Sequence, residues 1–221
     1  MVSRGVLSGA ADAVRVSYDR VAADYAARVG GELAGKPVDR ALLTALAERA
    51  GASGPVGDLG CGPGHVAAHL VGRGVRVVGV DLSPGMLAEA RRARPDLPVA
   101  AGDLLALPLR DGALSAAVAF YSLIHLPRGR EVAALAEVSR VLAPGGVLLA
   151  AVHVGDEMRH LEEWWGHQVS LDFRFFTIAE LLGWLALAGF EVEDVLERDH
   201  YPGVEVETRR AYVRAVRPPR R

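Results

Sequence analysis

The chain has 221 residues, of which 51% are hydrophobic and 24% charged, and its formal net charge is −2. This length fits one domain that buries a full hydrophobic core. A general nucleic-acid-binding surface would be basic, so the slightly acidic balance argues against that class of protein. The single cysteine, Cys61, excludes an intrachain disulfide and gives no sign of an oxidising compartment.

The hydropathy pattern predicts neither a targeting segment nor a membrane segment. The N-terminus lacks an uninterrupted apolar core followed by a cleavage site. The most apolar stretches, 114–126 and 141–154, are broken by Ser, His, Pro or Gly and are too short to cross a bilayer. The basic C-terminal RPPRR is typical of a solvated tail. We therefore expect a cytoplasmic protein with no membrane partner.

The first 52 residues predict two amphipathic helices. The first has one stripe of side chains at steps of four and three, namely Val14, Tyr18, Val21, Tyr25 and Val29. This spacing places Tyr18 and Tyr25 two turns apart on the same face. A second helix is expected from Val38 to Ala50, and Gly51 is suited to end it.

Strands and helices then alternate, which is typical of a doubly wound, mostly parallel sheet with right-handed crossovers. The expected strands are PVGDL at 55–59, VRVVGVD at 75–81, LPVAAGD at 97–103, SAAVAFYS at 115–122 and VLLAAVHV at 147–154. Ser83 followed by Pro84 predicts a helix start between the second and third strands. Another helix is expected over 130–143, closed by the Pro-Gly-Gly at 144–146.

The last third of the chain follows a different pattern. Residues 155–176 are polar and aromatic by turns. Thr177 and Glu180 form a capping-box pair before a helix that Gly189 stops. The segments 190–199 and 204–216 alternate apolar and polar residues across a Tyr-Pro-Gly turn. This alternation predicts an antiparallel strand pair that finishes the sheet.

The stretch VGDLGCGPGHVAAHL at 56–70 places three glycines between a strand and a helix, as in loops pressed against nucleotide-like ligands. A dinucleotide-binding turn needs a third glycine where this chain has His65. Pro63 removes a backbone donor that a phosphate cradle would use. No Gly-Lys-Ser/Thr follows, which excludes a nucleotide P-loop. The loop therefore favours close contact with a ligand that carries no phosphate.

Several blocks in register resemble the class I S-adenosylmethionine (SAM)-dependent methyltransferases, in particular the small stand-alone enzymes of the type 11/25 sort. In chain order these blocks are SYDRVAADYAARV, DLGCGPG, VVGVDLSPGMLAEAR, GDLLALPL, SLIHL and EVSRVLAPGGVLLAA, and they span roughly residues 18–154. The resemblance implies an α/β, Rossmann-like, mostly parallel seven-stranded sheet with an antiparallel C-terminal strand pair and N-terminal cap helices.

The same resemblance implies one methyltransferase domain over 1–221. Its expected parts are cap helices at 1–52, a SAM-binding core at 53–154, a variable substrate-covering segment at 155–189, and a C-terminal hairpin with tail at 190–221. The implied cofactor is SAM, with S-adenosylhomocysteine (SAH) as its product. The residues expected to bind it are Tyr18, Tyr25, Asp58, Gly60, Cys61, Gly62, Gly64, His65, Asp81, Leu82, Met86, Gly102, Asp103, Leu104, Phe120 and Tyr121.

The chemistry of SAM agrees with these residues, because SAM carries a ribose, an adenine and a zwitterionic methionine but no phosphate. Asp81 is suited to accept hydrogen bonds from both ribose hydroxyls. Asp103 and the amide of Leu104 are suited to the adenine edge, with Leu82 and Met86 on its faces. The remaining acid, Asp58, lies at the end of a strand and is expected to face the methionine ammonium. The glycines are expected to make room for the ligand, since a Cβ there would clash.

Methyl transfer requires alignment of the nucleophile and, for a hydroxyl or amine, removal of a proton. His125, after the fourth strand, is the first candidate base, and His153, at the end of the fifth, is the second. Two more histidines, His160 and His167, lie in the variable segment. The aromatic residues Trp164, Trp165, Phe173, Phe175 and Phe176 either wall an acceptor pocket, with Asp172 or Arg174 as its polar handle, or simply cover the sheet.

Several acceptor classes are disfavoured by what the blocks lack. The chain has FYSLIHL where N6-adenine and N4-cytosine enzymes carry (D/N)PP(Y/F), and Cys61 is not placed as the nucleophile of a C5-cytosine enzyme. No metal site is expected, because His65 and His69 have no third ligand nearby. We expect metal-independent methylation of an O or N nucleophile on a small molecule by a monomer or homodimer, without nucleic acid. The alternatives are methylation of a tRNA or protein, and a non-catalytic SAM-binding subunit.

Overall fold

The computed structural model describes residues 9–51 and 53–219, and the remaining parts of the predicted cap segment and tail lie outside the described residues. The α-helices are α1 (Gly9–Val29), α2 (Pro37–Ala50), α3 (His65–Val71), α4 (Pro84–Ala93), α5 (Glu131–Val141) and α6 (Ile178–Leu187), and the short 3-10 turns are η1 (Glu32–Gly35) and η2 (Leu123–His125). The strands are β1 (Val56–Leu59), β2 (Val77–Asp81), β3 (Val99–Ala101), β4 (Leu114–Phe120), β5 (Leu142–His153), β6 (Met158–Trp164), β7 (His167–Arg174), β8 (Glu191–Arg198) and β9 (Arg210–Val216).

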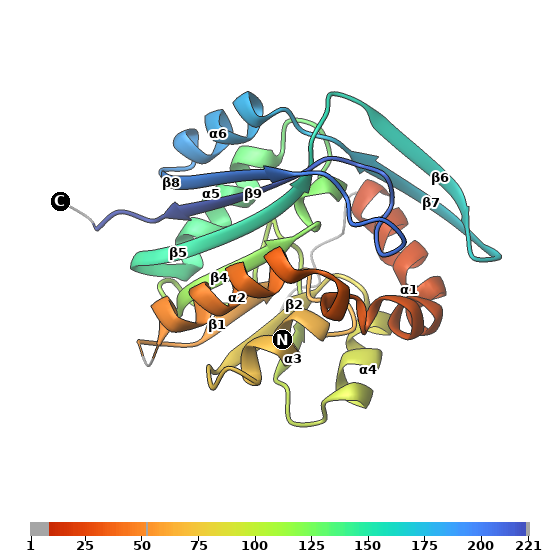
Figure 1. The fold of residues 1–221 in the computed structure, drawn as a ribbon, viewed down its shortest axis with the longest axis horizontal. Coiled ribbons are helices and arrows are strands. Elements are labelled where there is room, and N and C mark those ends of the chain that lie inside the picture. The colour runs from red at the N-terminus through yellow and green to blue at the C-terminus, as the bar shows by residue number, and fades with distance from the viewer. Residues whose placement is uncertain (1–8, 52, 220–221) are drawn as a thin grey trace.

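The predicted seven-stranded sheet is confirmed, with strand order β3-β2-β1-β4-β5-β9-β8 (Figure 1). The first five strands in this order pair in parallel, whereas β9 runs antiparallel to both β5 and β8. The carboxyl ends of the parallel strands therefore lie along one edge of the sheet, which is where doubly wound folds bind their ligands.

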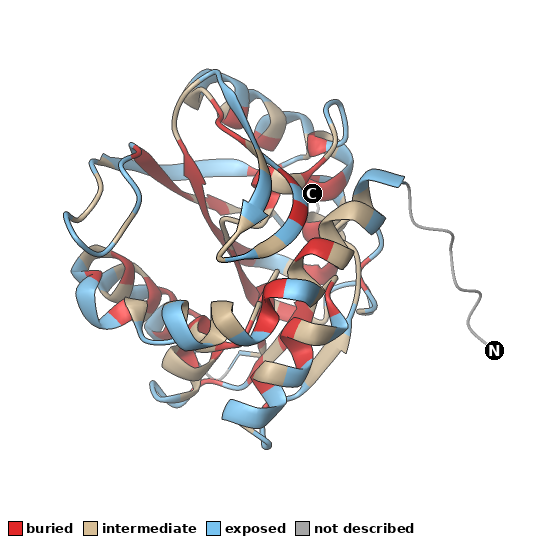
Figure 2. Ribbon diagram, turned by 90° about the vertical axis from the view of Figure 1, so that its right-hand side faces the viewer, coloured by how far each residue is buried: buried red, intermediate tan, exposed pale blue. Residues whose placement is uncertain are grey.

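Two apolar layers hold the helices on opposite faces of the sheet. On one face, α2 and α3 contribute Leu43, Leu46, Val66 and Leu70. On the other, α5 and α6 contribute Leu135, Val138, Leu181 and Leu185. Figure 2 shows the buried positions concentrated in the sheet and on the inner faces of the helices. This two-sided cover explains why the parallel strands read as continuous apolar runs.

The helix ends follow the predicted local chemistry. The Ser83 hydroxyl accepts a hydrogen bond from the Met86 amide at 3.0 Å, and Pro84 occupies the first turn of α4. Thr177 and Glu180 form the expected reciprocal capping box of α6. Gly51 adopts a φ of 48° after α2. These residues set where α4 and α6 begin and where α2 ends.

Two predicted boundaries are wrong. The Pro-Gly-Gly at 144–146 does not close a helix but lies within β5, where a bulge opposite β4 absorbs the extra residues. The last strand begins at Arg210 rather than at Val204, because the residues before it form a loop that buries Glu205 against basic side chains. Alternation of apolar and polar residues does not distinguish that loop from a strand.

The predicted variable segment contains a two-stranded sheet that the sequence did not predict. Strands β6 and β7 pair antiparallel and stand apart from the main sheet, beside α1 (Figure 1). The turn between them has Trp165 at a φ of 54° followed by Gly166 at 84°.

None of the described helices is long and apolar enough to cross a bilayer.

Candidate functional site

A cavity of about 800 Å³ opens at the carboxyl edge of the parallel strands. Its walls come from the loops after β1, β2, β3 and β4, from the end of β5, from α1 and η1, from the β6–β7 hairpin and from the loop between β8 and β9. A volume of this size lies at the upper end of the usual range for small-molecule sites. It is large enough for two ligands side by side.

The cavity gathers all but one of the residues predicted to bind or react. Those that line it are Tyr18, Tyr25, Asp58, Gly60, Cys61, Gly62, His65, Asp81, Leu82, Met86, Gly102, Asp103, Leu104, Phe120, Tyr121, His125 and His153. The exception is Gly64, which lies behind the loop at the start of α3. Sequence blocks separated by up to 135 positions in the chain thus meet at one surface, from Tyr18 to His153.

Packing within the protein accounts for most of the glycines in this loop. The sequence pattern instead predicts that they make room for a ligand. A Cβ on Gly60 would come within 2.3 Å of the Ser122 Cβ, and one on Gly64 within 3.2 Å of side-chain atoms of Ala90 and Leu97. A Cβ on Gly62, at a φ of 51°, would meet only Cε1 of Tyr25, at 4.0 Å, which is an ordinary van der Waals contact. A close approach to a ligand is therefore a reason for glycine at position 62 alone.

Asp81 holds the glycine loop and faces the cavity at the end of β2. Its carboxylate accepts a hydrogen bond from the Gly62 amide and another from the Ser83 amide, each at 2.8 Å. Burial raises the pKa of Asp81 and outweighs these hydrogen bonds, which lower it. The two amides fix the carboxylate oxygens, whose remaining lone pairs are free to accept further hydrogen bonds.

Asp58 is buried at the end of β1, and its Oδ2 has no hydrogen-bond partner among the described residues. Burial raises its pKa to about 7. Nearby, His65 also has a buried Nδ1 without a partner in the described chain, while its Nε2 lies 3.4 Å from Glu32. Unpaired buried polar atoms are costly, so this corner of the cavity is prepared for a polar or cationic ligand group.

Asp103 follows β3 in a tight turn, where its Oδ1 accepts a hydrogen bond from the Leu105 amide at 2.9 Å. Gly102 allows this turn to pack, since a Cβ there would lie 2.5 Å from Pro108. The apolar side chains Leu82 and Met86 line the same end of the cavity. This end therefore combines a flat apolar lining with a hydrogen-bonding rim.

Helix α1 and the hairpin together cover the cavity. The Ser17 hydroxyl accepts a hydrogen bond from the Ser170 amide at 2.9 Å, and Arg20 donates to the Gln168 carbonyl. The rings of Tyr18 and Tyr25 pack edge-on against each other and against Trp164. Hydrogen bonds and ring contacts thus join α1 to the hairpin.

His125 is engaged at both ring nitrogens. Its Nδ1 lies 2.9 Å from the Asp172 carbonyl oxygen, which only accepts hydrogen bonds, so Nδ1 carries the proton. Its Nε2 accordingly accepts from the Tyr18 hydroxyl at 2.7 Å. Burial lowers the pKa of His125 to about 4. The imidazole is therefore neutral and joins η2, α1 and β7.

His153 differs because, among the described residues, only its Nδ1 has a hydrogen-bond partner, the Thr208 hydroxyl at 2.9 Å. Its ring lies between those of Tyr121 and Phe175, at centroid distances of 5.0 and 5.2 Å. Burial, helped by the charge of Arg210, lowers its pKa to about 3. His153 thus presents a neutral imidazole to the cavity.

Only some of the residues predicted to form an aromatic wall line the cavity. Four of its residues line the cavity, namely Trp164, Trp165, Phe173 and Phe175. Phe176 packs in the core instead, edge-on to Trp184. Neither predicted polar handle lines the cavity, because Asp172 pairs with His160 and Arg174 is buried against Glu131. Of the two other histidines, His160 lines the cavity and His167 instead pairs with Asp24 on α1.

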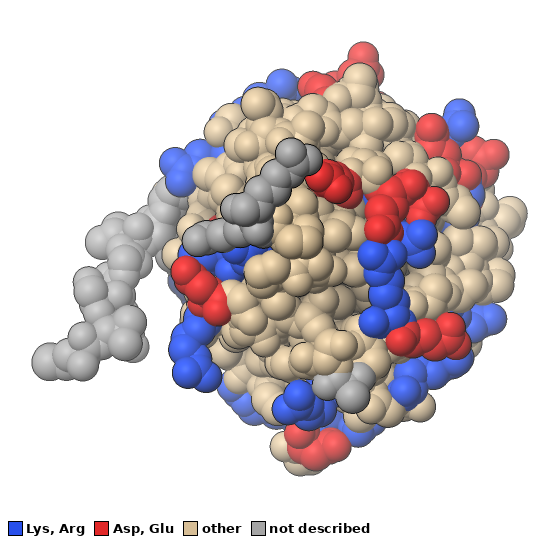
Figure 3. Space-filling view, turned by 90° about the vertical axis from the view of Figure 1, so that its left-hand side faces the viewer, with Lys and Arg blue, Asp and Glu red and all other residues tan. Residues whose placement is uncertain are grey.

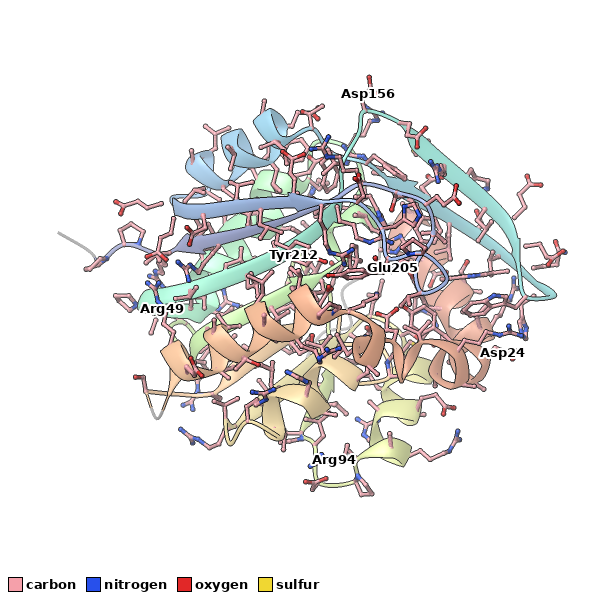
Figure 4. The ribbon with its side chains drawn as sticks, viewed as in Figure 1. Asp24, Arg49, Arg94, Asp156, Glu205 and Tyr212 are labelled. Atoms are coloured by element: carbon pink, nitrogen blue, oxygen red, sulfur yellow. The ribbon has the colours of Figure 1, made fainter. Side chains whose placement is uncertain are left out.

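Sequence reasoning also missed an ionic network beside the cavity. Arg198 donates to Asp39 at 2.8 Å and to Glu205 at 2.6 Å, and the Tyr212 hydroxyl donates to Asp39 at 2.9 Å. Glu205 and Tyr212 of this network are labelled in Figure 4. The sole lysine, Lys36, lies 3.3 Å from Glu205.

Comparison with known proteins identifies the kind of domain that forms this cavity. A family model described as a methyltransferase domain matches residues 56–146, which hold the glycine loop and all three strand-end carboxylates. Residues 56–146 are a class I methyltransferase domain. The predicted resemblance to the SAM-dependent enzymes of this class is confirmed.

Relatives of this domain include methyltransferases of different acceptors, demethylmenaquinone and malonyl-[acyl-carrier protein] among them. A demethylmenaquinone methyltransferase of Beutenbergia cavernae is 44% identical over 112 residues, which cover 51% of this chain and 45% of that protein. This chain therefore spans less than half of that relative's length.

Two solved structures share the fold over nearly the whole chain. A 1,6-didemethyltoxoflavin-N1-methyltransferase of Burkholderia thailandensis, with bound SAH, has a TM-score of 0.73 at 23% identity and covers 97% of this chain and 92% of its own. The cyclase SpnF has a TM-score of 0.73 at 24% identity and covers 98% and 100%. At these identities the methyltransferase domain shares an architecture with both proteins, and no more follows for its reaction.

Proposed function

We propose that the chain is a SAM-dependent methyltransferase that moves a methyl group to an O or N nucleophile of a small molecule without a metal. The observation that carries this proposal is the arrangement of Asp58, Asp81 and Asp103 at successive strand ends around one cavity. The unpartnered Oδ2 of Asp58 adds a buried acceptor where a cationic ligand group fits.

The cavity lining fits SAM in three parts. We assign the ribose to Asp81, whose oxygens are oriented by two amides and keep lone pairs for two hydroxyls. The ammonium goes to Asp58. The adenine goes between Leu82 and Met86, against the rim formed by Asp103. When bound, SAM supplies a methyl group already activated by the sulfonium.

Tyr18 and Tyr25 close the methionine end in this proposal. Their hydroxyls and rings lie under the cover formed by α1, where burial raises the pKa of both phenols. They therefore stay neutral and exclude water. Backbone at Gly60, Gly62 and Gly102, with Cys61, His65, Leu104, Phe120 and Tyr121, completes the proposed cofactor lining. Gly64 serves the packing of α3 instead.

Of the two histidines expected to react, we propose His153 as the one that contacts the acceptor. His125 has no free ring nitrogen, because Tyr18 and the Asp172 carbonyl occupy both. We therefore assign His125 to positioning the cover through its hydrogen bond with Tyr18. His153 keeps its Nε2 for a hydrogen bond with an acceptor.

The small-molecule class is supported by the cover that α1 and the β6–β7 hairpin place over the cavity and by the formal net charge of −2. Figure 3 shows the face remote from the carboxyl edge of the sheet, and basic and acidic side chains lie next to one another there. Methylation of a tRNA or protein, or cofactor binding without catalysis, are the alternatives. A cytoplasmic location, a monomeric or homodimeric state and the absence of a nucleic-acid partner stay predictions.

Calorimetric titration with SAH tests the proposed cofactor site. We expect one SAH per chain, and we expect Asp81→Ala to weaken binding at least tenfold, because charge-assisted hydrogen bonds contribute about 1.5–3 kcal/mol. Asp111→Ala is the matched control, since that carboxylate pairs with Arg140 away from the cavity and its loss leaves affinity unchanged. Equal affinity of Asp81→Ala and the native chain would remove the ribose assignment.

Turnover is tested separately, by release of SAH from SAM in the presence of small-molecule acceptors. A cofactor-binding chain that released no SAH with any acceptor would favour the non-catalytic alternative. Activity on tRNA or protein that falls steeply with added salt would favour the macromolecular one.

A further inference from the structure

One wall of the cavity is a row of four planar groups that begins at the proposed cofactor end. The ring of Tyr121, directly after β4, lies 5.0 Å from that of His153 at an interplanar angle of 33°. His153 in turn lies 5.2 Å from Phe175 at 29°. The guanidinium of Arg159 then lies 4.7 Å from the centroid of the Phe175 ring. All four residues line the cavity.

Arg159 is placed to bind an anion at the far end of this row. It stands on β6, and its Nε and Nη2 donate to Glu157 at 2.9 and 2.6 Å. Its Nη1 has no partner among the described residues. Stacking on Phe175 and pairing with Glu157 hold the planar guanidinium in one orientation, which reduces the entropy lost when a ligand binds.

The other cations of this wall are already neutralised. Arg210 and Lys36 lie 6.0 and 5.8 Å from the centroid of the Tyr121 ring. Both pair with Glu205, and Lys36 also pairs with Glu32. Among these described cations, Arg210 and Lys36 are buried, whereas Arg159 is about half exposed and keeps Nη1 for an acceptor.

We propose that the methyl acceptor is an elongated planar compound with an anionic group at the end remote from its reacting atom, and that Arg159 recognises this anion. The aromatic row contacts the planar body, since such rings favour offset or edge-on packing with other rings. Arg159 supplies the charge-assisted hydrogen bond at the end. This assignment of an acceptor class rests on the proposed function, because it takes the Tyr121 end as the cofactor end.

The test compares two probes of the same shape on SAH-saturated protein, namely 6-hydroxy-2-naphthoate and its neutral amide. We expect calorimetry to show about tenfold tighter binding of the carboxylate. Arg159→Gln removes this preference, and Arg159→Lys restores part of it because the charge remains. Arg49→Gln is the control, since Arg49 pairs with Glu193 at the opposite end of the molecule (Figure 4).

Equal binding of the two probes, an undiminished preference in Arg159→Gln, or no binding of either probe would overturn the proposal. Failure of the proposed function is seen independently, as a lack of SAH binding in the preceding titration. The Arg159 side chain is about half exposed, so its replacement leaves the core intact. A native circular dichroism spectrum of each variant checks this.

Discussion

At the scale of single residues, the site depends on how each carboxylate is partnered. Asp81 is fixed by two amides, whereas Asp58 keeps one oxygen without a partner in the described chain. Burial acts on both, but only Asp58 has a pKa raised to about 7. Asp58 is therefore the group whose ionisation ligand binding changes most.

We expect SAH binding to depend on pH through Asp58. Below pH 7 its carboxyl is protonated in the ligand-free chain, and an ammonium ligand requires the proton to leave. Affinity should therefore fall about tenfold per pH unit from pH 7 downward, with about one proton released near pH 6. Calorimetry in two buffers of different ionisation enthalpy measures this release.

The variant Asp58→Asn separates this effect from other titrating groups, including His65. It should bind SAH more weakly at pH 7.5 and show no proton release. The same raised pKa means that Asp58 stabilises the ligand-free fold below about pH 4, and that this contribution is lost as pH rises toward 7. An SAH affinity that stays constant between pH 7.5 and 5.5 would contradict the ammonium assignment.

At the scale of elements, the cover of the cavity consists of α1 and the β6–β7 hairpin joined through His125. Tyr18 contributes the hydroxyl and Asp172 the carbonyl that hold its imidazole. Ser17 and Ser170 add a second connection. Because these contacts cross between three elements, α1 and the hairpin should open together.

Removing the Tyr18 hydroxyl should loosen α1. A neutral hydrogen bond contributes about 1 kcal/mol, so Tyr18→Phe should speed amide hydrogen exchange in α1 about fivefold while keeping the ring contacts. His125→Ala should have the same effect and extend it to β7. Tyr201→Phe serves as the control, since Tyr201 accepts a hydrogen bond from the Val38 amide outside the cover. Unchanged exchange in both variants would show that His125 does not join these elements.

Much of the fold followed from local chemistry, whereas the cover did not. Continuous β-branched runs that alternate with helices, and helix caps such as Ser83, are local signals. The parallel core was therefore predictable. The β6–β7 hairpin depends on Trp165 at a positive φ, a conformation that no turn signature for an aromatic residue announces. The partners of His125 come from residues 107 and 47 positions away. Spacing in the chain therefore identified His125 but not its role.

At the scale of the whole molecule, a buried ionic network joins the helical layer to the antiparallel end of the sheet. Arg198 on β8 connects Asp39 on α2 with Glu205 in the following loop. Both carboxylates have side chains only 1% exposed. Loss of the shared guanidinium would leave the buried Asp39 without an ion-pair partner among the described residues, and Glu205 with Lys36 and Arg210 alone.

We expect Arg198→Met to lower the free energy of unfolding by about 3–5 kcal/mol in urea titrations. Arg94→Met, which breaks the exposed pair with Asp96 at the bottom of Figure 4, should lower it by less than about 1 kcal/mol. Burial acts to raise the pKa of Glu205, but Arg198 and its other partners lower it to about 2. The native chain should therefore lose this stabilisation as pH falls from about 4.5 to 2. Equal effects of the two arginine variants would contradict the network's role.

The most direct test of the whole account is a crystal structure of the chain with SAH. We predict that the ribose hydroxyls lie within hydrogen-bonding distance of the Asp81 carboxylate and that the ammonium faces Asp58. The sulfur should point toward the wall that begins at Tyr121. SAH bound elsewhere, or with its ribose away from Asp81, would contradict the account.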